Sequence, residues 1–238
     1  MSRKQLLIFV SCILLISLSG CMYPQSEKSE NRVPLDSQIQ TVQSAVNQFR
    51  KDQNGLLPIK NQDTTVDIYQ KYPIDFKRLE KYLPDPPGNA FESGGVFQYV
   101  LIDVETNPTV KIYDLRIAET IQDYNLRLSM FRDEHTYPPF KEQLHTDVYT
   151  LDYKKIGYKE QPVVDSPYSE SQLSIVIDTK GKLFVDYTPD LVKAVEGKDK
   201  LTEGEDIRKK LTDDSPFVPA FSLPYTVDEN NRPVFMTK

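Results

Sequence analysis

The chain of 238 residues has few of the residues on which many enzymes and small secreted proteins depend, with two cysteines, two histidines, nine glycines and no tryptophan. Two cysteines cannot form a disulfide framework, and nine glycines exclude a collagen-like chain. Two histidines and so few glycines also leave little material for histidine-based metal sites or glycine-rich phosphate loops. The hydrophobic share of 39% is too high for a fully disordered chain, so we expect one or two globular domains.

Positive charge is also scarce, since 29 basic residues face 35 acidic ones and give a formal net charge of −6. Proteins that bind nucleic acid in general carry a basic surface, so we expect no nucleic-acid partner. The sequence contains no Gly-x-Ser-x-Gly elbow, no Gly-x-Gly-x-x-Gly fingerprint and no phosphate-binding loop ending in Gly-Lys-Ser/Thr. We therefore expect no cofactor, no metal site and no catalytic residues.

The N-terminal residues carry the strongest pattern in the sequence. Arg3 and Lys4 precede an apolar run over residues 6–18, which is shorter than the roughly 20 residues that a bilayer-spanning helix needs. A basic start followed by a short apolar run is typical of a secretory signal peptide. Residues 18–21 read Leu-Ser-Gly-Cys.

This tetrapeptide resembles the lipobox of bacterial prolipoproteins, in which small residues precede a cysteine that receives a diacylglyceryl group. The resemblance implies that residues 1–20 are a signal peptide, that cleavage falls between Gly20 and Cys21, and that Cys21 carries the lipid. It also implies an anchor on the extracytoplasmic face of the plasma membrane. The alternatives are an ordinary secretion signal and an uncleaved anchor. The mature part resembles envelope lipoproteins of Gram-positive bacteria.

Residues 21–35 are mostly polar and show no apolar periodicity. Such a segment is typical of a flexible tether. With about 14 residues it would reach on the order of 20 Å from the lipid to the folded part.

Comparison of the chain with itself indicates an internal repeat. The apolar positions of residues 39–50 recur in residues 121–132, and both stretches have the spacing of an amphipathic helix. Residues 74–79 then match 151–156, and residues 100–103 match 175–178 at the start of a hairpin pattern. We predict an α+β fold in which residues 36–114 and 115–197 form two tandem units, each a helix plus an antiparallel hairpin.

A C-terminal partial unit is predicted over residues 198–238. Thr202 and Glu205 have the spacing of a capping box, which predicts a short helix containing Ile207 and Leu211. A hairpin with strands at 225–228 and 234–236 follows.

One stretch combines aromatic rings with positive charge. A predicted strand over residues 148–159 interleaves three tyrosines with three lysines, namely Tyr149, Tyr153, Tyr158, Lys154, Lys155 and Lys159. Aromatic faces and ammonium groups can bind sugars or polyanionic wall polymers, so this stretch is a candidate ligand surface. The simpler interpretation is that the tyrosines occupy a half-buried face while the lysines protect an edge strand.

The two histidines, His135 and His145, flank a Pro-Pro loop and lie near several carboxylates. Their spacing matches no metal motif, and we expect exposed loop histidines. Three functions remain. The sequence favours a membrane-anchored, extracytoplasmic binding or scaffolding protein of the cell envelope, with another envelope protein or a wall polymer as partner. The alternatives are a solute-binding lipoprotein of a transporter and, with less support, a cell-wall hydrolase.

Overall fold

A computed structural model describes residues 34–236 except 61, 64 and 198. The chain divides into two compact parts, Met1–Pro34 and Leu35–Lys238, and all the described helices and strands belong to the second. The predicted signal peptide, Gly20 and Cys21 lie outside the described residues. None of the helices in the described part is both long and apolar enough to cross a membrane.

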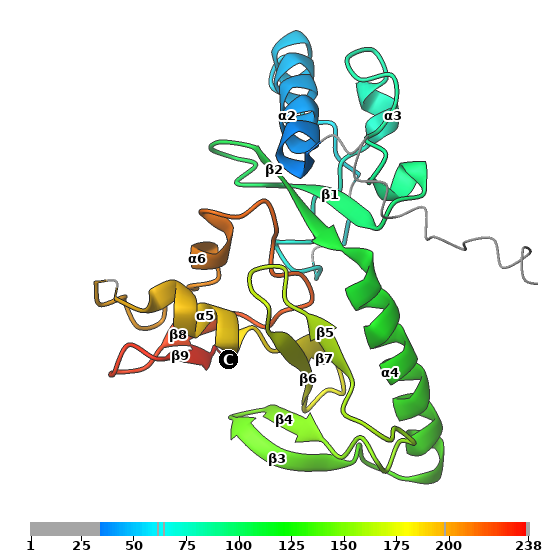
Figure 1. Ribbon diagram of the computed structural model, residues 1–238, viewed down its shortest axis with the longest axis vertical. Helices are drawn as coiled ribbons and strands as arrows, with labels where there is room; N and C mark the ends of the chain where they lie inside the picture. Colours follow the sequence, from blue (N-terminus) through cyan, green and yellow to red (C-terminus); the bar gives the residue numbers. More distant parts are fainter. Residues whose placement is uncertain (1–33, 61, 64, 198, 237–238) are drawn as a thin grey trace, which may run out of the picture. The chain divides into compact units, whose positions relative to one another are not determined.

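The first helix covers an antiparallel hairpin (Figure 1). Helix α2 (Leu35–Asp52) buries Val42, Val46 and Phe49 in one core with strands β1 (Phe97–Ile102) and β2 (Thr109–Asp114). The helix ends where Asn54 and Gly55 adopt positive φ angles of 53° and 89°, as the Asn-Gly pair predicts. A short helix α3 (Phe76–Leu79) and a 3₁₀ turn η3 (Phe91–Ser93) lie between α2 and the hairpin in the chain.

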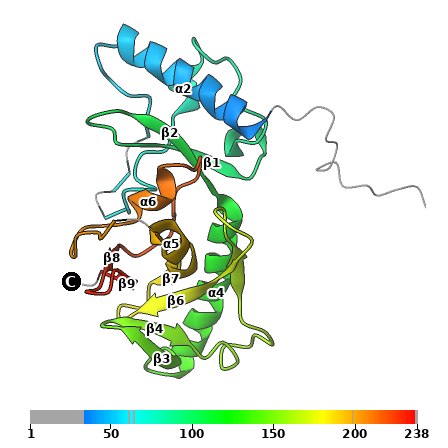
Figure 2. The same cartoon turned by 60° about the vertical axis from the view of Figure 1, so that its left-hand side comes forward.

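Another long helix covers a five-stranded antiparallel sheet (Figure 2). Helix α4 (Leu115–Glu134) places Ile121, Tyr124 and Leu128 in the core of this part. The strands are β3 (Phe140–His145), β4 (Val148–Leu151), β5 (Val163–Asp165), β6 (Gln172–Asp178) and β7 (Leu183–Val185). They run in the order β3-β4-β6-β5, and β7 also pairs with β6.

The α+β class is confirmed, and equivalent contacts recur in both units. Asp75 N donates to Pro58 O at 2.8 Å, and Asp152 N donates to Pro139 O at the same distance. The residues beside these bonds pair in the same way, because Ile59 bridges Ile74 and Phe140 pairs with Leu151. Each unit therefore repeats a helix, a short antiparallel pairing and a hairpin, in that order.

The part that follows the second hairpin differs from the prediction. Helix α5 (Thr188–Val195) was not predicted; it begins after Tyr187, and the carboxylate of Asp186 accepts a 2.9 Å bond from Thr188 N. The predicted capping box is wrong, because helix α6 (Lys209–Thr212) begins after Ile207. Gly204, with a φ of 85°, turns the chain and donates to Thr226 Oγ1 at 2.7 Å.

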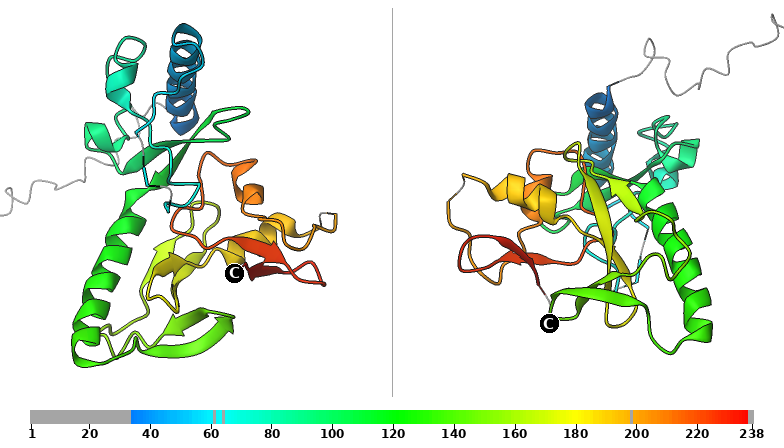
Figure 3. Two further views of the ribbon diagram at one scale, coloured as in Figure 1. Left: turned by 180° about the vertical axis from the view of Figure 1, so that it is seen from behind. Right: turned by 60° about the horizontal axis from the view of Figure 1, so that its bottom comes forward.

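The final hairpin is as predicted (Figure 3). Strands β8 (Tyr225–Val227) and β9 (Pro233–Phe235) pair antiparallel and join the core of α4 and β6.

Residues 216–221 connect this C-terminal part to both sheets. Ile112 N on β2 donates to Pro216 O, and Val218 N donates back to Ile112 O, both at 3.0 Å. Val185 N on β7 donates to Phe221 O at 2.8 Å. The C-terminal segment is therefore hydrogen-bonded to the first unit, and this packing positions the residues of the site described next.

Candidate functional site

The predicted tyrosine–lysine surface is not one continuous strand. Strand β4 ends at Leu151, and residues 152–157 form successive turns with Gly157 at a φ of 85°. The prediction of a strand through residue 159 is wrong, because the chain turns after Leu151: Lys155 N bonds to Asp152 O at 3.0 Å, and Tyr158 N bonds to Tyr153 O at 3.1 Å.

The tyrosines of this surface are held by different neighbours. The ring of Tyr149 packs 4.8 Å from that of Phe140, whereas Tyr153 lies half-buried in the turn. The Tyr158 hydroxyl donates to Asp123 on α4, and the Arg127 guanidinium lies 4.3 Å from the centre of the Tyr158 ring. One face of Tyr158 is therefore covered.

The lysines of the same stretch remain at the surface. Lys154, Lys155 and Lys159 are exposed, and Lys155 lies 3.9 Å from Asp152 in a weak ion pair. The structure thus brings Tyr158 to α4, whereas Lys154 and Lys155 stay in the turn after β4.

The two histidines lie at the ends of different elements. His135 caps the C-terminus of α4 and stacks on Phe131 with the ring centres 4.0 Å apart, and His145 is the last residue of β3. In the part of the chain that the structure describes, no group of three or more His, Cys, Asp or Glu side chains could hold a metal ion.

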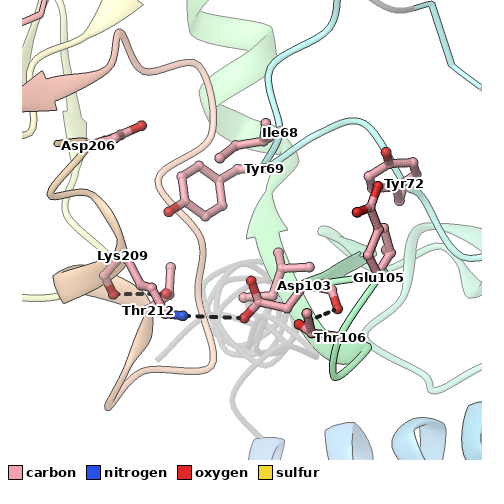
Figure 4. A pocket seen from close by; sticks show the side chains of 11 residues that line it. Ile68, Tyr69, Tyr72, Asp103, Glu105, Thr106, Asp206, Lys209 and Thr212 are labelled. Carbon is pink, nitrogen blue, oxygen red and sulfur yellow. Dashed lines mark hydrogen bonds and ion pairs between the residues drawn. The ribbon is translucent and has the colours of Figure 1, made fainter.

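A cavity of about 430 Å³ lies where the first unit meets the C-terminal segment (Figure 4). Three stretches line it: residues 68–72 before α3, residues 102–106 at the turn after β1, and residues 206–212 around α6. Its volume falls in the range of small-molecule sites. The side chains that carry its chemistry are Tyr69, Tyr72, Asp103, Glu105, Asp206 and Lys209.

Tyr69 is the most buried aromatic residue of the lining, with 5% of its surface exposed. Its hydroxyl makes no hydrogen bond within the described residues, and in Figure 4 it points to the side of the cavity that carries Asp206 and Lys209. Burial raises the pKa of Tyr69 well above its ordinary value, more than the nearby Arg208 lowers it, so the hydroxyl keeps its proton.

Arg208 holds together the residues on this side of the cavity. Its side chain is only 2% exposed, and its guanidinium bonds to Asp67 at 2.9 Å and to Asp206 at 2.7 Å. The guanidinium also lies 4.9 Å from the centre of the Tyr69 ring. Burial by itself lowers the pKa of Arg208, but the bonds and charges of the two aspartates outweigh it and the pKa is raised.

The remaining charges are on the open side of the cavity. Lys209 Nζ lies 3.8 Å from Asp103, and both side chains are well exposed to solvent. Glu105 is exposed and forms no ion pair with a described residue. Asp103 has a positive φ of 50°, and its carbonyl oxygen accepts hydrogen bonds from Thr106 N and Asn107 N. This tight turn fixes the direction of the Asp103 side chain.

The two threonine hydroxyls of the cavity are already used. Thr212 Oγ1 donates to Lys209 O at 2.9 Å, and Thr106 Oγ1 to Asp103 O at 3.4 Å. The lining therefore offers the phenols of Tyr69 and Tyr72, carboxylates and apolar surface, which can recognise a ligand by hydrogen bonds, charge and contact.

None of the residues of this site was predicted from the sequence. Its residues come from three separate stretches, 68–72, 102–106 and 206–212, and none of them belongs to a motif with fixed spacing. The one local signal is Asp206, which is two residues from the arginine that it holds.

Comparison with known proteins gives one match. Residues 35–114, which run from the start of α2 to the end of β2, match the model described as the YphF family N-terminal domain. The match includes Tyr69, Tyr72, Asp103 and Glu105 but not Asp206 or Lys209. Neither the curated proteins nor the solved structures gave a significant match.

Proposed function

We propose that this protein is a lipid-anchored binding protein on the extracytoplasmic face of the plasma membrane, and that it binds its ligand in the cavity of Figure 4. The anchor is proposed from the Leu-Ser-Gly-Cys sequence that ends at Cys21. Two or more acyl chains hold a protein stably on a membrane, whereas one chain does so only marginally.

The observation that carries the binding role is the Tyr69 hydroxyl. Only 5% of the surface of Tyr69 is exposed, and a tyrosine this buried normally has its hydroxyl hydrogen-bonded. Here the hydroxyl opens into a cavity of about 430 Å³ with no partner among the described residues. A ligand in the cavity would supply that partner.

A solute-binding lipoprotein of a transporter is the second candidate. It is favoured by the position of the cavity, which lies between the first unit and the C-terminal segment rather than on a single sheet. The antiparallel sheets argue against it, since such receptors commonly have two lobes with parallel sheets. A receptor of this kind would be needed for uptake of the solute, whereas an envelope binding protein would not.

The anchor is tested with Cys21→Ser in the native host. We expect the wild-type chain to incorporate labelled palmitate, to sediment with membranes and to be digested by protease added to intact spheroplasts. Cys21→Ser should incorporate no label and should keep its signal peptide. Equal labelling of both chains, or protection of the wild-type chain from protease, would contradict the proposal.

The binding role is tested separately by crosslinking in cells. A photoreactive residue in place of Glu105, at the cavity, should give a discrete adduct, and one in place of Glu119, on the exposed face of α4, should not. Identical adduct patterns at both positions would argue against a ligand in the cavity.

A further inference from the structure

We infer, on the basis of the binding role proposed above, that the cavity accepts a small ligand bearing a protonated amine, held by Tyr69, Asp103 and Glu105. Nothing in the family match assigns a ligand to these residues. The inference comes from three properties of the cavity: its charge, the buried Tyr69 with its hydroxyl, and its apolar walls.

The charge of the cavity favours a cation. Three carboxylates line it, those of Asp103, Glu105 and Asp206, against the single ammonium of Lys209. Asp206 shares the Arg208 guanidinium with Asp67, so these three groups together still carry one negative charge. A phosphate or carboxylate ligand would be repelled here, whereas an ammonium group would be attracted.

The carboxylates on the open side are accessible to such a ligand. The pair between Lys209 and Asp103 has a 3.8 Å separation and both side chains are largely exposed, so it contributes little stability and a ligand amine can replace Lys209. Glu105 has no ion-pair partner among the described residues, so its carboxylate can bind an ammonium group without breaking any contact.

Tyr69 adds direction to this attraction. Its ring cannot move freely, because it is buried and has the Arg208 guanidinium 4.9 Å from its centre. Its hydroxyl can accept a bond from an ammonium N–H and can donate to a hydroxyl of the same ligand. A rigid partner of this kind binds at low entropic cost.

The apolar part of the lining limits the ligand to a compact carbon skeleton. Ile68, Ile102 and Val104 line the cavity together with Tyr72, and Ile68 exposes 55% of its surface. Methylene groups or one face of a sugar ring would pack on these side chains. Amino sugars and alkyl amines share this chemistry, and the two are separated by the test.

The test measures binding to the full chain in detergent by calorimetric titration near neutral pH. The two amine probes are glucosamine, an amino sugar, and putrescine, an alkyl amine, and each has a neutral counterpart, N-acetylglucosamine and butanediol. We expect saturable binding of at least one amine, at least about tenfold weaker binding of its neutral counterpart, and loss of affinity with added salt.

Matched variants locate the binding. Tyr69→Phe should weaken binding of the amine about tenfold, because it removes one hydrogen bond to a charged group, and Glu105→Gln should weaken it by about threefold. The controls are Tyr137→Phe and Glu119→Gln, which change exposed residues outside the cavity and should leave the affinity unchanged. Tyr69→Phe breaks no hydrogen bond of the described structure, so it should fold.

Several results would overturn the inference: no saturable binding of either amine, equal affinity for an amine and its neutral counterpart, or equal losses in the cavity and control variants. These results do not depend on Cys21. A chain that fails the palmitate test but binds amines through Tyr69 would refute the proposed anchor alone. A chain that crosslinks through position 105 but ignores both amines would refute the ligand class alone.

Discussion

Arg208 offers the sharpest test of how the C-terminal segment is fixed to the first unit. Its guanidinium bonds to Asp67 before α3, to Asp206 before α6 and to the carbonyl of Ser222 at 3.4 Å. Arg208→Met keeps most of the volume of the side chain but removes the positive charge. The two carboxylates then remain close together without a counter-charge.

The expected loss of stability is about 3 kcal/mol. Removal of one partner from a buried ion pair costs roughly 3–5 kcal/mol, because the remaining charge stays desolvated. Here the side chains of Asp67 and Asp206 are 20% and 31% exposed, so water can solvate them in part. The loss of stability should therefore lie at the lower end of this range. Asp67→Asn should cost only about 1 kcal/mol, because the bidentate pair with Asp206 survives.

The free energy of unfolding is measured by urea denaturation of the full chain in detergent. Unfolding is monitored by circular dichroism, because the chain has no tryptophan to serve as a fluorescent probe. If the unpaired carboxylates cause the loss, Arg208→Met combined with Asp67→Asn and Asp206→Asn should recover about half of it. An Arg208→Met chain within about 0.5 kcal/mol of wild type would refute the reasoning. So would a triple variant as unstable as the single one.

Two further predictions concern tyrosine hydroxyls. The bond from Tyr158 lowers the pKa of Asp123, so Tyr158→Phe should return that pKa towards its ordinary value, as NMR titration of the carboxyl carbon would show; an unchanged pKa would contradict the bond. Burial raises the pKa of Tyr99 to about 12 against the opposing effect of its bond to Asn89, so the phenol loses its proton first in the unfolded chain. The free energy of unfolding should therefore fall as the pH rises from about 10 to about 12. Urea titrations at alkaline pH should show a shallower fall for Tyr99→Phe, and an unchanged slope would contradict this role of Tyr99.

The repeated elements could be predicted from the sequence because their signals are local. The apolar spacing of α2 recurs in α4 within twelve residues, and the turn at Gly181 lies between two short apolar runs that form β6 and β7. Helix α5 was missed because it has only eight residues, too few to show a helical period beyond doubt.

The predicted strand over residues 148–159 failed for a different reason. The alternation of tyrosines and lysines continues past Leu151, but the chain turns where Lys155 N bonds to Asp152 O and Gly157 takes a positive φ. A pattern of side chains does not record where the backbone bonds of a strand end. The cavity could not be predicted at all, because packing alone brings Tyr69 and Asp206 together.

Arg208 and the Tyr69 hydroxyl are neighbours with different roles: we expect Arg208 to stabilise the fold and the hydroxyl to bind the ligand. The guanidinium holds Asp67, Asp206 and the ring of Tyr69, and these contacts join segments that are distant in the chain. The Tyr69 hydroxyl takes no part in them. Tyr69→Phe should therefore lower amine affinity at nearly unchanged stability, whereas Arg208→Met should lower both, because the ring loses the group that orients it. Equal effects of the two variants on stability would mean that the hydroxyl belongs to the structural cluster and is not free for a ligand.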